Sequence, residues 1–160
     1  MRTDSHFLRN LRRLTSLYLR LALGVAFLSA VADRFGIWGP PGTHNVAWGN
    51  FTRFTQYTAR VNPWAPPALV PLLAWVATVA ETILGVALLG GAYTRLAGLA
   101  SGVLLSLFAI GMTIGTGVKS ALDASVFSAA AGAFGLALLG SDRWSVDGLR
   151  AMAGRSDGAA

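Results

Sequence analysis

The sequence contains no cysteine and only two histidines, His6 and His44, among its 160 residues. The absence of thiols excludes dithiol redox chemistry within the chain, cysteine-held iron–sulfur clusters and covalently attached haem. The two histidines flank the first long apolar stretch, so a membrane crossing between them would prevent a bis-histidine haem or a histidine-based zinc site. We therefore expect no haem, iron–sulfur cluster or metal.

Charged residues are also scarce, at 12% of the sequence, whereas 54% of the residues are hydrophobic. The mean hydropathy is +0.55, which is typical of an integral membrane protein. Four apolar stretches each approach the roughly 20 residues that cross a bilayer as a helix. They are Leu14 to Ala32, Ala68 to Gly91, Leu96 to Ile114 and Leu122 to Leu139. The predicted fold class is all-α, with one four-helix transmembrane domain over residues 1–140.

Basic residues give the predicted orientation. Eight of them fall on the side of the two termini and four on the other side, so the positive-inside rule places both termini in the cytoplasm. Residues 141–160 then form a cytoplasmic tail, and the expected location is the plasma membrane of a bacterium or archaeon. The net charge of +6 is spread along the loops, so no nucleic-acid partner is expected.

A cleavable signal peptide is the alternative interpretation of the N-terminal region. Arg12 and Arg13 precede an apolar run that ends in Ala30-Val31-Ala32, a small-residue pattern like that of a cleavage site. Arg20 would interrupt the hydrophobic part of such a signal. A permanent first helix can instead place that arginine inside the bundle.

The predicted outer loop, residues 35–67, is the only long connection. Apolar and polar residues alternate at near-helical spacing from Val46 to Val61, which predicts a short interfacial helix. Trp38, Trp48 and Trp64 are expected at the level of the lipid headgroups. The loop would then either anchor and cap the bundle or act as a lid over a pocket.

Two charges within the predicted spans stand out, Arg20 and Glu81. Glu81 lies on a stripe of mostly small residues, and Arg20 lies one turn from Gly24, so both are expected to face other helices. At a rise of about 1.5 Å per residue, Arg20 lies roughly 9 Å from Leu14 and Glu81 roughly 13 Å from Gly90, at the cytoplasmic ends of their spans. The similar depths predict a buried Arg20–Glu81 ion pair. The pair would either fix the helix register or bind a ligand such as a quinone.

A second group of polar residues is predicted at the opposite end from the termini. It forms an outer vestibule of five residues: Asp33, Arg34, His44, Lys119 and Asp123. Asp123 has an alternative role, because an aspartate at the start of a helix caps it and complements its dipole. Gly98 with Gly102, and Gly111 with Gly115, are small-residue pairs that allow close packing within the bundle or with a partner.

The sequence resembles the DoxX/DoxD family of small four-helix membrane proteins. The resemblance is carried by "RLALGVAFLSAVADRFG", "AETILGVALLGGAYTRLAGLASGVLL" and "KSALDASVFSAAAGAFGLALL". In the family pattern Arg20 and Gly24 match the first helix, Glu81 and Gly85 the second, and Asp123 the fourth. The resemblance implies a membrane subunit of a thiosulfate:quinone-type oxidoreductase, although no soluble redox subunit is fused to this chain.

Three functional interpretations follow. The first is a quinone-linked redox subunit in which Arg20 and Glu81 bind the quinone while a partner protein supplies electrons. This interpretation predicts a cavity of head-group size beside them. The second is a non-catalytic scaffold or assembly subunit, with an apolar small-residue face left for a protein partner or a second copy. A carrier of protons or small solutes is less favoured, because no inverted repeat is evident.

Overall fold

The computed structural model describes residues 2–142 and 144–156, and every regular element in these ranges is a helix. Three of the helices are long and apolar enough to cross a membrane: α1 (Arg2–Arg34), α3 (Val70–Gly90) and α4 (Thr94–Thr116). The shorter elements are α2 (Phe51–Val61), η1 (Pro67–Leu69), α5 (Val118–Asp123), α6 (Val126–Leu139) and α7 (Val146–Ser156). The predicted all-helical class is confirmed for this part of the chain.

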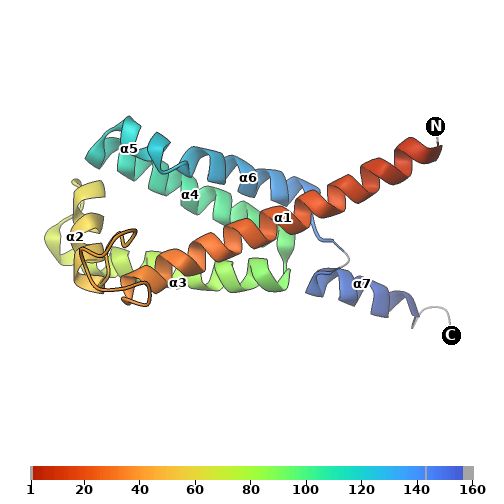
Figure 1. Ribbon diagram of the computed structural model, residues 1–160, viewed down its shortest axis with the longest axis horizontal. Coiled ribbons are helices and arrows are strands. Elements are labelled where there is room, and N and C mark those ends of the chain that lie inside the picture. The colour runs from red at the N-terminus through yellow and green to blue at the C-terminus, as the bar shows by residue number, and fades with distance from the viewer. Residues whose placement is uncertain (1, 143, 157–160) are drawn as a thin grey trace.

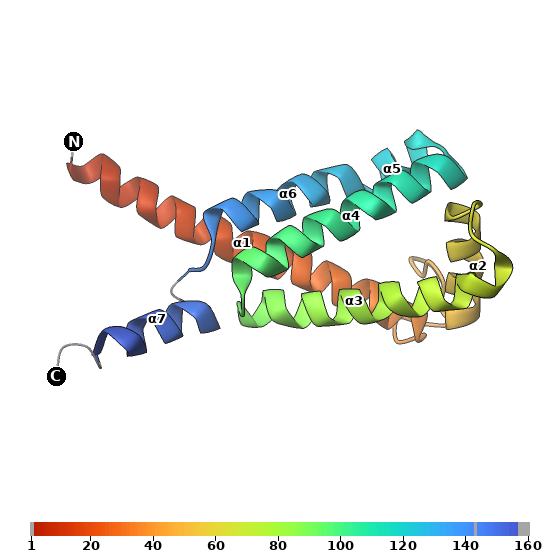
Figure 2. The ribbon, with the colours of Figure 1, turned by 180° about the vertical axis from the view of Figure 1, so that it is seen from behind.

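The long helices lie roughly along one axis (Figure 1). α4 packs along α6, and α1 packs along α3 while crossing the other helices obliquely (Figure 2). The N-terminal part of α1, α7 and the α3–α4 turn lie at one end, which we call the α7 end. The loop after α1 and helix α2 lie at the other end, which we call the α2 end (Figure 1).

Small residues allow the close contact between α1 and α3. A Cβ atom added at Gly24 would lie 3.0 Å from the Gly85 carbonyl oxygen, and one added at Gly85 would lie 3.2 Å from the Gly24 carbonyl oxygen. The two backbones therefore touch at this crossing, as small-residue positions in membrane helices permit. The sequence prediction that another backbone approaches Gly24 is confirmed.

The fourth predicted span differs from the structure in one respect. The prediction had one helix over Leu122–Leu139, but α5 ends at Asp123 and α6 begins at Val126. Ser125 between them has a left-handed backbone, with φ of 55°. α6 alone, with 14 residues, is about 21 Å long, which is shorter than the hydrocarbon core of a bilayer.

Helix α2 also begins later than the pattern from Val46 predicted. Asn50 caps the helix, and its side-chain oxygen accepts a hydrogen bond from Arg53 N at 2.9 Å. Gly49 before it has φ of 68°, and an added Cβ would lie 2.5 Å from Pro41 N. The helix therefore cannot extend back through Gly49, since this residue packs against the preceding loop in a conformation that favours glycine.

The C-terminal end of α2 rests on α4 at Gly115. A Cβ atom at this position would lie 2.1 Å from the Arg60 carbonyl oxygen and 2.5 Å from Val61 Cα. The predicted close packing at Gly111 and Gly115 is therefore made within the chain, against α2. Gly98 and Gly102 make the equivalent close contact with α6.

Gly115→Ala is expected to destabilise the protein by about 1–3 kcal/mol, because the added methyl group overlaps backbone that cannot rotate away. Gly135→Ala is the matched control, since nothing lies within 4 Å of its added Cβ. Alanine there is expected to be neutral or stabilising by up to about 1 kcal/mol, from its better helix propensity. Unfolding in mixed micelles, titrated with a denaturing detergent, measures both changes. Equal effects of the two substitutions would contradict the packing of α2 on α4.

Candidate functional site

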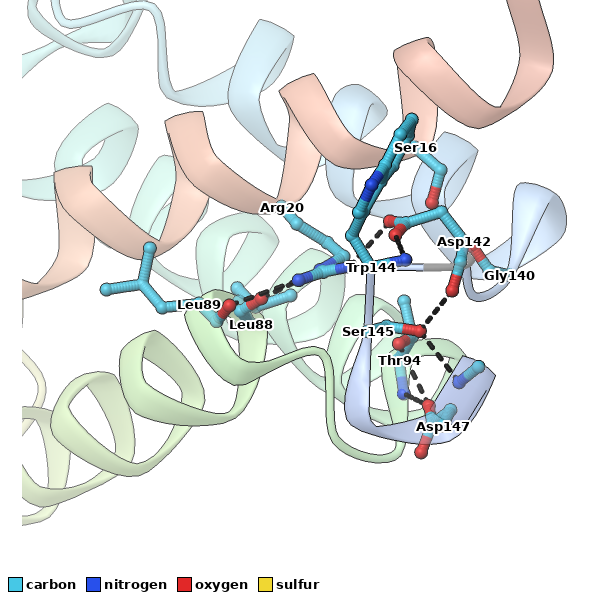
Figure 3. A network of polar contacts seen from close by, with 11 residues as sticks. Ser16, Arg20, Leu88, Leu89, Thr94, Gly140, Asp142, Trp144, Ser145 and Asp147 are labelled. Carbon is cyan, nitrogen blue, oxygen red and sulfur yellow. Dashed lines mark hydrogen bonds and ion pairs between the residues drawn. The ribbon is translucent and has the colours of Figure 1, made fainter. Parts of the chain in front are cut away.

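Arg20 is buried at the α7 end, where it joins three segments of the chain (Figure 3). Its Nε and Nη2 donate to the carbonyl oxygens of Leu88 and Leu89 at 3.0 and 3.1 Å. Its Nη1 donates to Asp142 Oδ2 at 2.5 Å, and both side chains of this ion pair are at most 2% exposed. The C-terminal carbonyls of a helix and a carboxylate are both favourable acceptors for a guanidinium group. Arg20 thus connects α1, the end of α3 and the segment after α6.

The segment after α6 is attached by further hydrogen bonds in the same region. Ser16 donates through Oγ to the Gly140 carbonyl oxygen at 2.6 Å, and Ser145 donates through Oγ to the Asp142 carbonyl oxygen. Asp142 also accepts from Trp144 N through its second carboxylate oxygen, at 2.8 Å. These contacts hold the chain between α6 and α7 against the bundle (Figure 3).

Asp147 caps the start of α4 from a distant part of the sequence. Its carboxylate accepts from Tyr93 N at 2.9 Å, from Thr94 N at 2.7 Å and from Thr94 Oγ1 at 2.9 Å. Partial burial alone would raise the pKa of Asp147, but the hydrogen bonds from Thr94 and Tyr93, together with the charge of Arg150, lower it. The carboxylate is therefore ionised at neutral pH and complements the positive end of the α4 dipole.

Arg34 forms the second buried ion pair, near the α2 end. Its Nη2 donates to both carboxylate oxygens of Glu81 at 2.7 Å, and its Nη1 donates to Thr78 Oγ1 at 2.9 Å. The guanidinium carbon lies 3.7 Å from the centre of the Phe54 ring, which places α2 against the same group. Arg34 Nε has no hydrogen-bond partner among the described residues, so part of the charge is stabilised by the ring face.

Asp33, the neighbour of Arg34, organises the loop that follows α1. Its Oδ2 accepts from Ala47 N at 2.8 Å, and its Oδ1 accepts from Trp48 N at 3.2 Å and from Gly49 N at 2.8 Å. Three backbone donors satisfy a carboxylate in a position where it is almost fully buried. Asp33 therefore holds the loop, while the adjacent Arg34 binds α3.

The predicted Arg20–Glu81 ion pair is wrong. Arg20 pairs with Asp142, and Glu81 pairs with Arg34. The prediction took Leu14 and Gly90 as helix ends at one level, but α1 continues to Arg2. In the observed register Arg20 lies beside Leu88 and Leu89, and Glu81 is about 11–12 Å further along α3. That separation exceeds the reach of the arginine side chain.

The five residues of the predicted outer vestibule occupy different surroundings. Asp33 and His44 line one groove, Arg34 is buried against Glu81, and Lys119 pairs with Asp123 at 2.6 Å within α5. The Lys119 and Asp123 side chains are 85% and 64% exposed, so their pair stabilises little. The structure brings Asp33 and His44 together, while the vestibule as a functional site stays a prediction.

The groove beside Asp33 and His44 has a volume of about 570 Å³. One wall is formed by α1 with Ala26, Ser29 and Ala30, and the other by the loop, from which Trp38 contributes an indole. Trp38 Nε1 donates to the Ser29 carbonyl oxygen at 3.1 Å and holds the loop against α1. The groove lies within the size range of small-molecule sites.

Sequence reasoning missed Asp142, the partner of Arg20. The residue was assigned to a polar tail, and its only signal is that a buried arginine requires a negative partner. Within the predicted spans only Glu81 and Asp123 could supply one. Thr78 lies one turn from Glu81 on α3 and is the acceptor for Arg34 Nη1, a role that its local sequence does not indicate. Phe54 and Trp48 were assigned to an interfacial helix, while their rings in fact lie against the same guanidinium group.

The distribution of side chains defines the class of protein. The buried core consists of apolar residues, several of them alanines, and large apolar side chains cover the outside of α1, α3, α4 and α6. The buried arginines are paired with carboxylates inside the bundle, and the buried Asp33 is satisfied by backbone donors, as apolar surroundings require. The chain is a helical, multi-pass membrane protein.

Residues 12–140 match the family model of methylamine utilisation protein MauE. Since the match covers most of the 160 residues, the chain belongs to this family. The DoxX/DoxD assignment is therefore wrong; its motifs are short combinations of small residues, arginine and glutamate that different membrane families can share. No curated protein and no solved structure matches the chain.

Proposed function

We propose that the chain acts in methylamine utilisation as a non-catalytic membrane subunit that holds and helps to assemble a redox partner. The family description supports the process. Oxidation of methylamine with water to formaldehyde and ammonia releases two electrons and two protons, and these electrons need an acceptor. A chain without cysteine offers no dithiol to accept these electrons, and the proposal assigns the oxidation to a partner protein.

The observation that carries the proposal is the pairing of the buried charges. Arg20 donates to Asp142 and to two carbonyl groups. Arg34 donates to Glu81 and Thr78 and lies against the Phe54 ring, although its Nε has no hydrogen-bond partner among the described residues. These side chains connect helices and loops to one another. Their arrangement favours a rigid support over a site that binds and releases a substrate.

The topology is part of the proposal. α1, α3 and α4 span the membrane, and α5 and α6 together form the fourth crossing, since their 22 residues from Val118 to Leu139 reach about 33 Å if nearly straight. α2 lies in the interface on the outer side, both termini are cytoplasmic, and the membrane is the plasma membrane of a bacterium or archaeon.

A quinone-linked redox subunit is the second candidate, and the groove beside Asp33 and His44 favours it. Its volume of about 570 Å³ exceeds what a quinone head group needs, and Trp38 and His44 offer an aromatic face and an imidazole. The sequence predicted instead a quinone bound directly by Arg20 and Glu81. That binding site stays a prediction, although both side chains already have protein partners.

Deletion of the gene in its natural host, with growth on methylamine as the readout, tests both candidates. For the assembly subunit, extracts of the deletion strain should lose both the methylamine-oxidising protein and methylamine-dependent reduction of an artificial electron acceptor. For the quinone-linked subunit, that reduction should persist while methylamine-dependent oxygen uptake by membranes is lost. Unimpaired growth on methylamine would contradict both.

Two variants, each expressed in the deletion strain, distinguish the two candidate functions. His44→Ala should restore growth if the chain is an assembly subunit and should leave oxygen uptake impaired if the groove binds quinone. Lys119→Gln, which changes only an exposed pair, is the matched control and should restore growth in either case.

A further inference from the structure

Two exposed arginines converge on the C-terminal end of α6. Arg12 of α1 donates from Nη2 to the Leu139 carbonyl oxygen at 3.0 Å. Arg95, at the start of α4, also lies close, and its Nε would be 2.9 Å from a Cβ atom added at Gly140. Arg12 and Arg95 thus reach consecutive residues of the chain from two different helices.

The charge of this pair is not compensated within the described residues. The two acidic groups placed nearby by the structure are already used, because Asp142 pairs with Arg20 and Asp147 caps α4. The only other ion pairs found there join Arg34 to Glu81 and Lys119 to Asp123. Arg9 and Arg13 are exposed on the neighbouring turns of α1 and add to the positive potential.

Apolar surface begins directly beside the two arginines. Leu138, adjacent to Leu139, is 79% exposed, and Leu14 and Leu99, each within about a turn of Arg12 or Arg95, are also exposed. Positive groups at the edge of a lipid-facing apolar surface match a phospholipid, whose phosphate contacts the arginines while its acyl chains cover the leucines.

We propose that Arg12 and Arg95 form a binding site for the headgroup of an anionic phospholipid at the α7 end. The phosphate takes hydrogen bonds from both guanidinium groups, and Arg9 and Arg13 strengthen the attraction. A bound lipid then links α1, α4 and α6 at a point where no carboxylate of the described residues joins them. The site is independent of the proposed function, because it depends only on the arginines and the surrounding apolar surface.

Native mass spectrometry of the detergent-purified full chain tests the proposal, with phosphatidylglycerol and phosphatidylcholine as the probes. The wild type is expected to retain one phosphatidylglycerol preferentially. The Arg12→Gln/Arg95→Gln variant is expected to bind it about 10- to 30-fold more weakly, given the attraction of about 1 kcal/mol per basic residue near an anionic surface. Arg53→Gln/Arg60→Gln removes two exposed arginines at the α2 end and is the matched control, with unchanged retention expected.

Further measurements keep the proposal falsifiable. Arg95→Gln alone spares the Arg12 hydrogen bond and should weaken retention several-fold while the protein stays folded, and Arg12→Lys/Arg95→Lys should restore most of it. Competition by millimolar inorganic phosphate would overturn the lipid site in favour of a small-anion site. Equal retention of both lipids, or equal losses in the α7-end and α2-end variants, would overturn it as well.

Discussion

Arg20→Leu is expected to lower the free energy of unfolding by about 3–5 kcal/mol, because it leaves the Asp142 carboxylate buried without a positive partner. The carbonyl groups of Leu88 and Leu89 also lose their donor, and the segment between α6 and α7 loses its link to α1. Asp142→Asn should destabilise the protein for the converse reason. Denaturing-detergent titration of the purified variants in identical micelles measures both.

The double variant Arg20→Leu/Asp142→Asn separates the ion pair from simple loss of packing. If the two charges interact directly, its loss of stability should be smaller than the sum of the single losses by about 1–3 kcal/mol. Lys119→Gln is the matched control, since it breaks an exposed ion pair and should cost less than about 1 kcal/mol. Additive losses, or an Arg20 variant as stable as the control, would show that the pair does not hold the α7 end together.

Arg34→Met is expected to release helix α2 from the bundle as well as to cost about 3–5 kcal/mol. The substitution leaves Glu81 buried without a positive partner and removes the cation that lies over the Phe54 ring. Methionine keeps much of the volume of the arginine side chain, so the effect is not simply that of a cavity. Since the chain has no cysteine, a single Thr58→Cys reporter gives background-free thiol labelling. Thr58 is buried in α2, so its labelling should be slow in the parent protein and much faster after Arg34→Met.

Two controls assign the effect to the α2 end. Arg20→Leu perturbs the α7 end of the bundle and should leave the labelling of the Thr58→Cys reporter slow under conditions where the protein stays folded. Thr52→Cys is exposed in α2 and should be labelled rapidly in every background. Slow labelling of Thr58→Cys after Arg34→Met would mean that α2 is held by its contact with α4 and not by Arg34.

The helices could be predicted from the sequence because their apolar runs are long. Lipid-exposed backbone must satisfy its own hydrogen bonds, so α3 and α4 were placed within two residues of their observed ends. The break at Ser125 could not be predicted, since nothing in its local sequence resembles a glycine or proline signal. α1 was predicted too short because its first turns are polar and amphipathic, which hydropathy does not detect.

The candidate site could be predicted only as a set of residues. Arg20 and Glu81 were singled out because ionisable side chains in an apolar bundle are costly, whereas Asp33 and Arg34 were singled out as part of an outer vestibule. Which of them pair depends on the register of α1 against α3, and that register is set by the contact of Gly24 with Gly85. Asp142 was missed because its burial results from the folding of a polar segment back onto the bundle, which no local pattern records.

The two buried arginines also determine how the protein can respond to bilayers of different thickness. Arg20 and Arg34 are separated by 14 residues on one continuous helix, or about 21 Å along its axis, and both hold α3. Sliding α1 along α3 would break both attachments at once. The protein therefore cannot adjust its hydrophobic length by helix slippage, so it must meet a thinner or thicker bilayer by tilting as a unit or by deforming the lipid around it.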